Sequence, residues 1–202
     1  MRIGILIALF FCITFLPGVD CRPVMDCPGF EDSLLVQWFP YKPLDSVKFT
    51  TATNSSRTFR VYSVRDSEPR RTKLCMPRRT IELAQYDLTD VHGPFRFELA
   101  KYITSDGRSK RNVFIDMRTQ FFSGDFNDTG FQKPAIEPQY GKFQLQSYNS
   151  IQLNGKLFTE VQGIFFDTTA SVKPAFQKIY ISKRHGLIAY ETYNPALLWV
   201  KE

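Results

Sequence analysis

The sequence predicts an all-β protein, either an antiparallel sandwich or a partly open barrel of about nine strands, preceded by a short irregular N-terminal arm. Three observations support this class. Short segments with period-two alternation recur from residue 45 onward, and turn-forming residues separate them. No long amphipathic helical pattern lies between these segments. Nineteen Phe and nine Tyr also favour strands, because aromatic rings pack well on a pleated surface.

Residues 1–20 have the form of a secretory signal. Arg2 precedes an uncharged apolar run over residues 3–16, and a Pro-Gly pair follows this run. Such a run matches a signal h-region and is shorter than the roughly 20 residues that a membrane-spanning helix needs. We therefore expect an exported protein, cleaved either after Gly18 or immediately before Cys21.

Cleavage before Cys21 would make this residue the first of the mature chain and the acceptor of a lipid. Its position just beyond the apolar run suits lipoprotein processing, although Asp20 stands where such signals carry a small residue. The mature chain would keep Cys21, Cys27 and Cys75, and an odd number leaves one thiol outside any pairing. If Cys21 is lipidated, Cys27 and Cys75 can form a disulfide worth about 2–4 kcal/mol. The alternative to this disulfide is that Cys27 or Cys75 is buried and unpaired.

The arm covers residues 21–44, where four prolines restrict regular pairing, and the β domain covers residues 45–202. A helical turn is expected within the arm, over Glu31–Trp38. The first part of the β domain has three expected strands, which are Lys48–Thr53, Arg57–Val64 and Arg79–Asp87. A charged loop over residues 66–77 precedes the third of them.

The middle of the chain contains the clearest half-buried pattern. A strand beginning at Phe95 is followed by one over Asn112–Phe122. In the second strand one face is predicted to point inward, with Val113, Ile115, Met117, Thr119 and Phe121. Residues 123–140 are rich in Gly, Pro, Asn and Asp, and predict a long loop.

The last part of the chain predicts two hairpins. Phe143–Leu153 and Leu157–Phe166 flank an Asn-Gly pair. A two-residue loop would pair Leu153 with Lys156 and mix the two faces, so we expect a three-residue loop that pairs Leu153 with Leu157. The final hairpin joins Gln177–Lys183 to Leu187–Thr192, and a strand over Leu197–Val200 follows.

Catalytic patterns are weak, so the sequence predicts a protein that is not an enzyme and assigns neither catalytic residues nor a cofactor. The two histidines, His92 and His185, both adjoin Gly in expected turns, and only Asp90 is close in sequence to either. The chain has no G-x-S-x-G motif. The segment Asp125–Gly130 partly matches a calcium loop, but Ile136 occupies the twelfth position, where an EF-hand has Glu. We expect a turn-rich surface loop there and assign no metal ligands.

Positive charge is concentrated in one segment of a chain whose formal net charge is +6. Between residues 57 and 79 two acidic residues face eight cations, which are Arg57, Arg60, Arg65, Arg70, Arg71, Lys73, Arg78 and Arg79. One interpretation is a patch for an anionic partner such as a glycan or a lipid headgroup. The other is a solvated loop with an edge strand that its charges protect from aggregation. Nucleic acid is not an expected partner of an exported chain without a nucleic-acid-binding motif.

Two stretches resemble a known group of proteins. Cys21 and Cys27 followed by Trp38-Phe39-Pro40-Tyr41, and the later run from Tyr180 to Glu191 with Trp199 beyond it, resemble uncharacterised small lipoproteins of Bacteroidota-type bacteria. The resemblance covers about a quarter of the chain and implies a lipid-anchored protein of the bacterial cell envelope, at the outer membrane, without an assigned activity.

Export, the position of Cys21 and this resemblance give one main expectation of function. The protein is expected to be a lipid-anchored cell-envelope protein that acts as a non-enzymatic binding or assembly module. The alternative is a secreted carbohydrate-binding or hydrolytic protein, which would need a surface cluster of aromatic rings and carboxylates. Only two Trp are available for such a cluster, so it would have to be built from Tyr.

Overall fold

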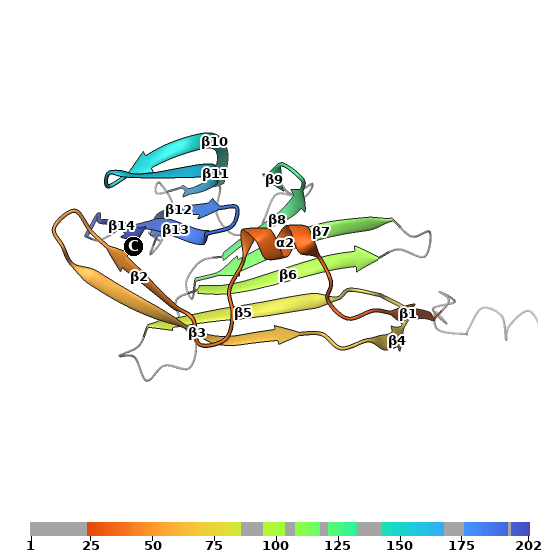
Figure 1. Ribbon diagram of the computed structural model, residues 1–202. Coiled ribbons are helices and arrows are strands. Elements are labelled where there is room, and N and C mark those ends of the chain that lie inside the picture. Colours follow the sequence, from red (N-terminus) through yellow and green to blue (C-terminus); the bar gives the residue numbers. More distant parts are fainter. Residues whose placement is uncertain are drawn as a thin grey trace, which may run out of the picture.

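The computed structural model of the chain describes residues 24–85, 95–103, 108–117, 121–132, 143–167, 176–193 and 195–202. Within these residues, strands form a twelve-stranded antiparallel sheet and a two-stranded sheet. The large sheet curls until it is nearly closed as a barrel, with one open seam (Figure 1). The predicted all-β antiparallel class is therefore confirmed. Of the two architectures that the sequence left open, sandwich or partly open barrel, the structure has the second, with more strands than the sequence predicted.

Strands that follow one another in the chain are mostly neighbours in the large sheet, as expected for hairpin connections. The order is β10-β11-β12-β13-β14-β2-β3-β5-β6-β7-β8-β9. The C-terminal strand β14 pairs with β2 and so brings the two halves of the chain together. These strands are β2 (Ser46–Thr50), β3 (Ser56–Asp66), β5 (Arg78–Gln85), β6 (Phe95–Ile103), β7 (Ser109–Asp116), β8 (Phe121–Asn127), β9 (Gly130–Gln132), β10 (Phe143–Leu153), β11 (Lys156–Phe166), β12 (Phe176–Ser182), β13 (Gly186–Thr192) and β14 (Leu198–Lys201).

The small sheet lies at one end of the large one, where β1 (Met25–Cys27) pairs with β4 (Arg70–Thr72) (Figure 1). A disulfide joins Cys27 to Cys75, with 5.2 Å between their Cα atoms. Cys75 also forms a β-bridge with Ile103 at the end of β6. The predicted disulfide is therefore confirmed, and it fixes the N-terminal segment to the large sheet across a sequence separation of 48 residues.

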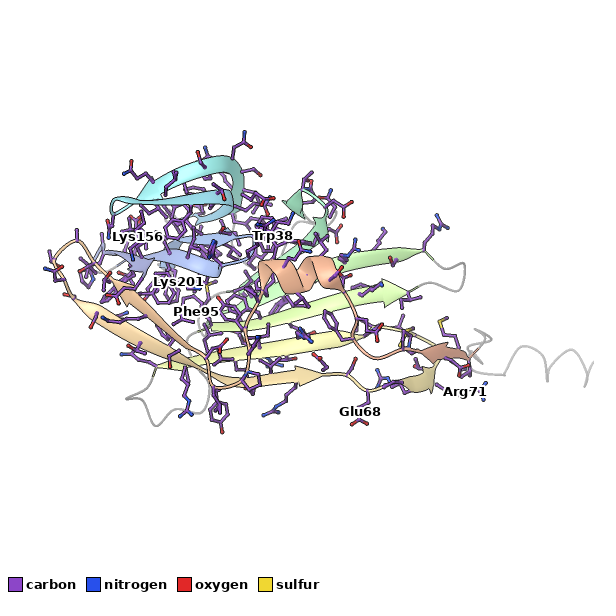
Figure 2. All side chains as sticks on the ribbon, viewed as in Figure 1. Trp38, Glu68, Arg71, Phe95, Lys156 and Lys201 are labelled. Carbon is purple, nitrogen blue, oxygen red and sulfur yellow. A yellow bond between two sulfur atoms is a disulfide. The ribbon has the colours of Figure 1, made fainter. Side chains whose placement is uncertain are left out.

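Aromatic rings fill the interior of the near-barrel. Phe49, Phe59, Phe95 and Tyr190 are each at most 2% exposed, and their ring centroids lie 5.2–6.1 Å apart in mainly edge-to-face contacts. This is the geometry that aromatic quadrupoles favour. Figure 2 shows Phe95 among the crowded side chains between the sheet walls. Period-two alternation in β2, β3, β6 and β13 directs these rings to one side of the sheet.

A second apolar cluster buries the other face of β12–β14. It contains Leu153 and Val161 from the β10–β11 hairpin, together with Tyr180, Ile188 and Val200 from the three strands below. In Figure 1 this hairpin lies over β12 and β13. Both faces of β12–β14 are therefore buried, which explains the nearly continuous apolar runs in these strands.

The helix α2 (Ser33–Trp38) covers part of the interior, and its sequence contains the signals that start and end it. Asp32 is the N-cap, and its Oδ1 accepts a hydrogen bond from Leu35 N at 3.1 Å. Pro40 disfavours continuation, because the residue before a proline avoids the helical region. The Trp38 ring contacts Phe126 at 5.6 Å between centroids, on the inner face of β8. The expected helical turn over Glu31–Trp38 is confirmed.

One ion pair holds α2 against the sheet. Arg111 Nε of β7 donates to Asp32 Oδ2 at 2.6 Å, and the Asp32 side chain is only 1% exposed. The same carboxylate therefore caps the helix with one oxygen and binds the sheet with the other. A carboxylate buried to this degree is stabilised only while both partners stay in place.

The segment after α2 is fixed at the opposite side of the interior. Tyr41 stacks on Phe97 and its hydroxyl accepts a hydrogen bond from Leu187 N at 2.7 Å. Gly186 lies directly against this phenol: its φ is +70°, and a Cβ there would be 2.6 Å from the Tyr41 oxygen. Glycine is therefore required at the β12–β13 turn both by backbone conformation and by close approach.

Side chains bridge the open seam in place of a backbone ladder. The Gln162 side chain of β11 accepts a hydrogen bond from Phe131 N of β9, and its Nε2 donates to Phe131 O at 3.3 Å and to Ser147 Oγ at 3.1 Å. Phe122 of β8 packs edge-to-face on Phe143 of β10, with centroids 4.8 Å apart. One amide and one ring pair thus connect the two ends of the large sheet.

The predicted strand over Asn112–Phe122 is wrong, because two strands occupy this stretch. β7 ends at Asp116 and β8 begins at Phe121, and these two residues are paired across the hairpin. Phe121 therefore lies on the outer face, where it stacks on Phe114, and Phe122 faces the core. Alternation alone could not reveal the reversal, because the apolar pattern continues through it.

Two predicted loops also contain strands. Most of β8 and all of β9 lie within residues 123–140, and β4 lies within residues 66–77. Asn127 and Gly130, which suggested a loop, flank the tight β8–β9 turn, where Gly130 has a φ of +108°. β4 is too short and too charged to show alternation, and its partner β1 lies far away in sequence.

The predicted three-residue loop between β10 and β11 is wrong. Leu153 pairs with Lys156 around a two-residue turn, in which Asn154 and Gly155 have φ of 45° and 79°. Positive φ at both central residues is the preference of Asn-Gly hairpins. This register pairs apolar with polar residues, but it costs little free energy, because Leu157 is 70% exposed at the hairpin tip and would gain no burial from another register.

We expect Asp32→Ala to lower the free energy of unfolding by about 2–4 kcal/mol, because it uncaps α2 and leaves the Arg111 charge unpaired. Urea denaturation measures this change. Asp26→Ala is the matched control, since Asp26 pairs with Arg71 on the surface, where both side chains are at least 76% exposed. The control should change stability by less than about 0.5 kcal/mol. Equal effects of the two substitutions would contradict the assigned role of Asp32.

We expect Gln162→Ala to destabilise the fold by about 1–3 kcal/mol, because the buried Phe131 N–H loses its acceptor. Amide exchange at Phe131 should accelerate while exchange in β5 and β6 stays slow. Gln144→Ala, at an exposed position of β10, serves as the control. Unchanged exchange at Phe131 in the Gln162 variant would show that the seam is closed by other contacts.

Candidate functional site

The eight cations between residues 57 and 79 lie in different environments. Arg57 and Arg79 are directed to aromatic rings: the Arg57 guanidinium lies 4.2 Å from the centre of the Trp199 ring, and that of Arg79 lies 5.1 Å from the Phe30 ring. Arg79 also donates two hydrogen bonds to the Asp66 carboxylate, at 2.7 and 2.6 Å, and this contact raises the Arg79 pKa. These two arginines therefore have structural partners.

Alternating charges cross the outer face of β5 and β6. Arg78 Nη1 donates to Glu98 at 3.0 Å, and Arg96 lies 3.8 Å from Glu98 and 4.0 Å from Glu82. The Ser63 hydroxyl donates to Glu82 at 2.8 Å. Arg78 thus belongs to a row of alternating charges on a solvated sheet face, which leaves little net charge there for a ligand.

Two more of these cations, Arg60 and Arg65, are exposed on β3. This strand lies between β2 and β5, so it is not an edge strand. Protection of an exposed sheet edge therefore does not explain these charges.

The remaining three cations, Arg70, Arg71 and Lys73, lie at the end of the molecule that carries β1 and β4, where Figure 2 marks Arg71. Other parts of the chain reach the same end. Lys101 N and Ile103 N donate to backbone oxygens of Pro77 and Cys75, both at 3.0 Å, so the end of β6 lies beside this segment.

We call this surface the basic end and define it by residues 24–27, 67–75, 101–103 and 108–110. The start of β7 belongs to it because Tyr102 pairs with Lys110 and Ile103 with Ser109. These residues include two carboxylates, Asp26 and Glu68, and six cations, which are Arg70, Arg71, Lys73, Lys101, Arg108 and Lys110. The basic end therefore carries most of the net charge of the chain.

Sequence reasoning missed three members of the basic end, because Lys101, Arg108 and Lys110 lie more than twenty residues beyond the basic segment. The disulfide and the Cys75–Ile103 bridge bring the two regions together. One sequence signal pointed to this surface. The expected Cys27–Cys75 disulfide places the N-terminal segment beside Arg70, Arg71 and Lys73, which lie within five residues of Cys75.

A surface hollow overlaps the basic end, which contributes four of its six lining residues. It is lined by Ser67, Glu68, Pro69, Arg70, Met76 and Arg78. The lining combines one carboxylate with two guanidinium groups, and its apolar part comes from a proline ring and a thioether. Arg78 Nη2 contacts the Met76 sulfur at 3.5 Å. The hollow lacks a combination of nucleophile and base that would support catalysis.

Lipidation was predicted at Cys21, which lies outside the described residues, as do the signal residues 1–20. Val24, the first described residue, lies three residues beyond Cys21 and immediately precedes β1. Since Cys27 is bonded to Cys75, the predicted lipid acceptor is the cysteine beyond the signal that takes no part in this disulfide.

His185 is an exposed residue of the β12–β13 turn, as the sequence predicted. Its ring lies 6.4 Å from Phe158, and its backbone oxygen accepts a hydrogen bond from Lys201 Nζ at 2.7 Å. His92 and Asp90 lie outside the described residues. In the described part of the chain, no group of three or more His, Cys, Asp or Glu residues is placed to hold a metal ion.

The segment Asp125–Gly130 forms the β8–β9 hairpin turn. Asn127 Oδ1 accepts hydrogen bonds from Thr129 N at 2.9 Å and from the Thr129 hydroxyl at 2.7 Å. Gly130 is required by its positive φ and by the Gln162 amide, which occupies the space of a Cβ. The residues that suggested a calcium loop are thus explained by a turn and by the seam.

Three buried polar groups have no hydrogen-bond partner among the described residues: Trp38 Nε1, Trp199 Nε1 and the Tyr190 hydroxyl. Tyr190 and Trp199 stack with centroids 6.1 Å apart, and Arg57 covers the outer side of Trp199. Burial raises the pKa of Tyr190 to about 12, against opposing influences of the Arg57 charge and of a distant contact between the Arg57 guanidinium and the hydroxyl. This cluster joins β13, β14 and β3 in the core, and no ligand chemistry is evident in it.

Comparisons with protein-family models, with curated proteins and with solved structures found no match. Among the residues that the structure describes, no helix has the length and apolar character needed to cross a membrane.

We expect Tyr41→Phe and Tyr190→Phe to have different effects on stability. Removal of the Tyr41 hydroxyl leaves the buried Leu187 N–H unpaired and should cost about 1–3 kcal/mol. Removal of the Tyr190 hydroxyl should change stability by less than about 0.5 kcal/mol near neutral pH, because that group makes no close hydrogen bond and only a distant contact with the Arg57 guanidinium. Urea denaturation of the two variants measures both values, and equal losses would contradict the assignment.

Tyr190 also makes the free energy of unfolding depend on pH. A buried tyrosine with a raised pKa stays neutral in the folded state, whereas in the unfolded state it ionises near its ordinary value of about 10. The stability that Tyr190 contributes through its neutral form is therefore present below pH 10 and lost as pH rises toward 12. The unfolding free energy of the Tyr190→Phe variant should fall less steeply over this range than that of the unchanged protein.

Proposed function

We propose that the chain is an exported, lipid-anchored protein of the bacterial cell envelope that acts as a non-enzymatic binding or assembly module. The observation that carries this proposal is the pairing of Cys27 with Cys75. It accounts for two of the three cysteines beyond the signal and leaves Cys21 as the thiol for modification.

The position of the disulfide also suits an anchor. Only five residues separate Cys21 from Cys27, and Cys27 is bonded directly to the segment that precedes β5. A lipid on Cys21 would therefore be connected to the folded domain by a short, covalently fixed segment. A disulfide is also typical of proteins outside the reducing cytoplasm, which agrees with export.

A non-enzymatic role is supported by the character of the described surface. On the outer face of β5 and β6 the charged side chains form salt bridges across neighbouring strands, in the row from Arg78 to Glu82. The alternative of a carbohydrate-binding protein would need exposed stacking rings. Trp38 and Trp199 are 3% and 4% exposed, so such a site would depend on tyrosines such as Tyr62 and Tyr102.

Intact mass spectrometry of the exported protein tests the proposal. We expect a chain that begins at Cys21 and carries the mass of a diacyl- or triacyl-glyceryl adduct. The Cys21→Ala variant should lose the adduct and leave the membrane fraction. An unmodified chain that begins at Val19 would overturn the anchor.

The same spectrum reports the disulfide independently. Reduction should add two hydrogen atoms to the mass of the Cys21→Ala variant, which keeps only Cys27 and Cys75 beyond the signal. A Cys27→Ser variant should show no such change. If reduction leaves the mass of the Cys21→Ala variant unchanged, Cys27 and Cys75 are not paired in the exported protein.

A further inference from the structure

We propose that the basic end is a membrane-contact surface, which binds the anionic headgroups of the bilayer that holds the anchor. This inference rests on the proposed lipid anchor for the orientation of the molecule. The binding chemistry itself depends only on residues that the structure describes.

Chain geometry brings the basic end close to the bilayer. Cys21 is three residues from Val24, where the described chain begins. An extended chain spans at most about 3.6 Å per residue, so a lipid on Cys21 would lie within roughly 11 Å of Val24. The disulfide at Cys27 prevents this segment from moving away from the end of the sheet.

The charges of the basic end act over this distance. The Debye length at physiological ionic strength is about 8 Å, comparable to the length of the tether. Arg70 and Lys110 are exposed and make no ion pair with any residue that the structure describes. Arg71 is paired with Asp26, but its side chain is 76% exposed. Each cation close to an anionic bilayer strengthens binding about fivefold, which corresponds to about 1 kcal/mol.

Exposed apolar side chains at the same end favour a bilayer over a soluble anion. Val24 is 50% exposed, Leu74 is 53% exposed and Tyr102 is 38% exposed. Three of the six exposed large apolar residues among the described residues therefore belong to the basic end. Aliphatic and tyrosine side chains beside cations suit the boundary between headgroups and acyl chains. A glycan can stack on the Tyr102 ring, but it has no acyl region to receive Val24 and Leu74.

Vesicle co-sedimentation tests the inference with the exported chain carrying Cys21→Ala, so that no acyl group contributes to binding. We expect binding to vesicles of phosphatidylcholine mixed with phosphatidylglycerol, little binding to phosphatidylcholine alone, and a loss of binding as salt is raised. The further change Arg70→Gln with Lys110→Gln should weaken binding about 25-fold, from two charges of about fivefold each.

Lys42→Gln with Arg60→Gln is the matched control. It removes the same charge from exposed positions near the start of β2, where Arg60 pairs with Ser46, and Figure 1 shows β2 away from β1 and β4. The control should bind nearly as the parent does. Thermal denaturation of both double variants checks that each remains folded, which their exposed positions favour.

Two results would overturn the inference: equal weakening by the two double variants, or tight binding to a sulfated polysaccharide without binding to anionic vesicles. The second result would make the basic end a glycan-binding surface. Failure of the anchor gives a different pattern, because mass spectrometry would then find no lipid on Cys21 while vesicle binding by the basic end persists. If the unchanged protein carries the Cys21 adduct but the Cys21→Ala chain does not bind anionic vesicles, only the membrane-contact surface is overturned.

Discussion

The two bonds of the Asp32 carboxylate join the N-terminal segment to the sheet, and much of the interior depends on them. One oxygen caps α2 and the other binds Arg111 of β7. With the helix fixed in this way, Trp38 packs on the aromatic rings of β8 and β9, and the following Tyr41 reaches the β12–β13 turn. A near-barrel with an open seam has no continuous ladder to hold its ends together, so this segment and Gln162 connect strands that backbone hydrogen bonds do not.

The sequence predicted the class of fold and the positions of the later hairpins, because alternation is clear where one face is buried and the other is solvated. Prediction failed where that condition was not met. In β10 and β11 the hairpin tip is exposed, and the Asn154-Gly155 turn set the register in place of the hydrophobic pattern. Between β7 and β8 the apolar spacing continued through a reversal of direction. The second apolar cluster depends on the hairpin lying over β12–β14, which no local pattern contains.

The candidate site was predicted only in part for a related reason. A run of cations in the sequence suggested one patch. In the structure Arg57 and Arg79 lie over the rings of Trp199 and Phe30, and Arg78 belongs to the row of alternating charges on β5 and β6. The basic end is assembled from four separate parts of the chain. Proximity in sequence therefore assigned Arg57, Arg78 and Arg79 to a patch to which they do not belong, and it missed Lys101, Arg108 and Lys110. The disulfide was the long-range contact that could be expected from composition alone.

The position of that disulfide determines how mechanical load enters the domain. A pull on the chain ahead of Cys27 passes through the sulfur atoms to Cys75 and from there to β5, in the middle of the large sheet. The helix α2 follows Cys27 in the chain and lies outside this path. Met25 and Asp26 of β1 lie ahead of Cys27, so the three-residue ladder of β1 and β4 bears the force first. The helix and the interior rings that it covers are therefore mechanically isolated from whatever holds the N-terminus.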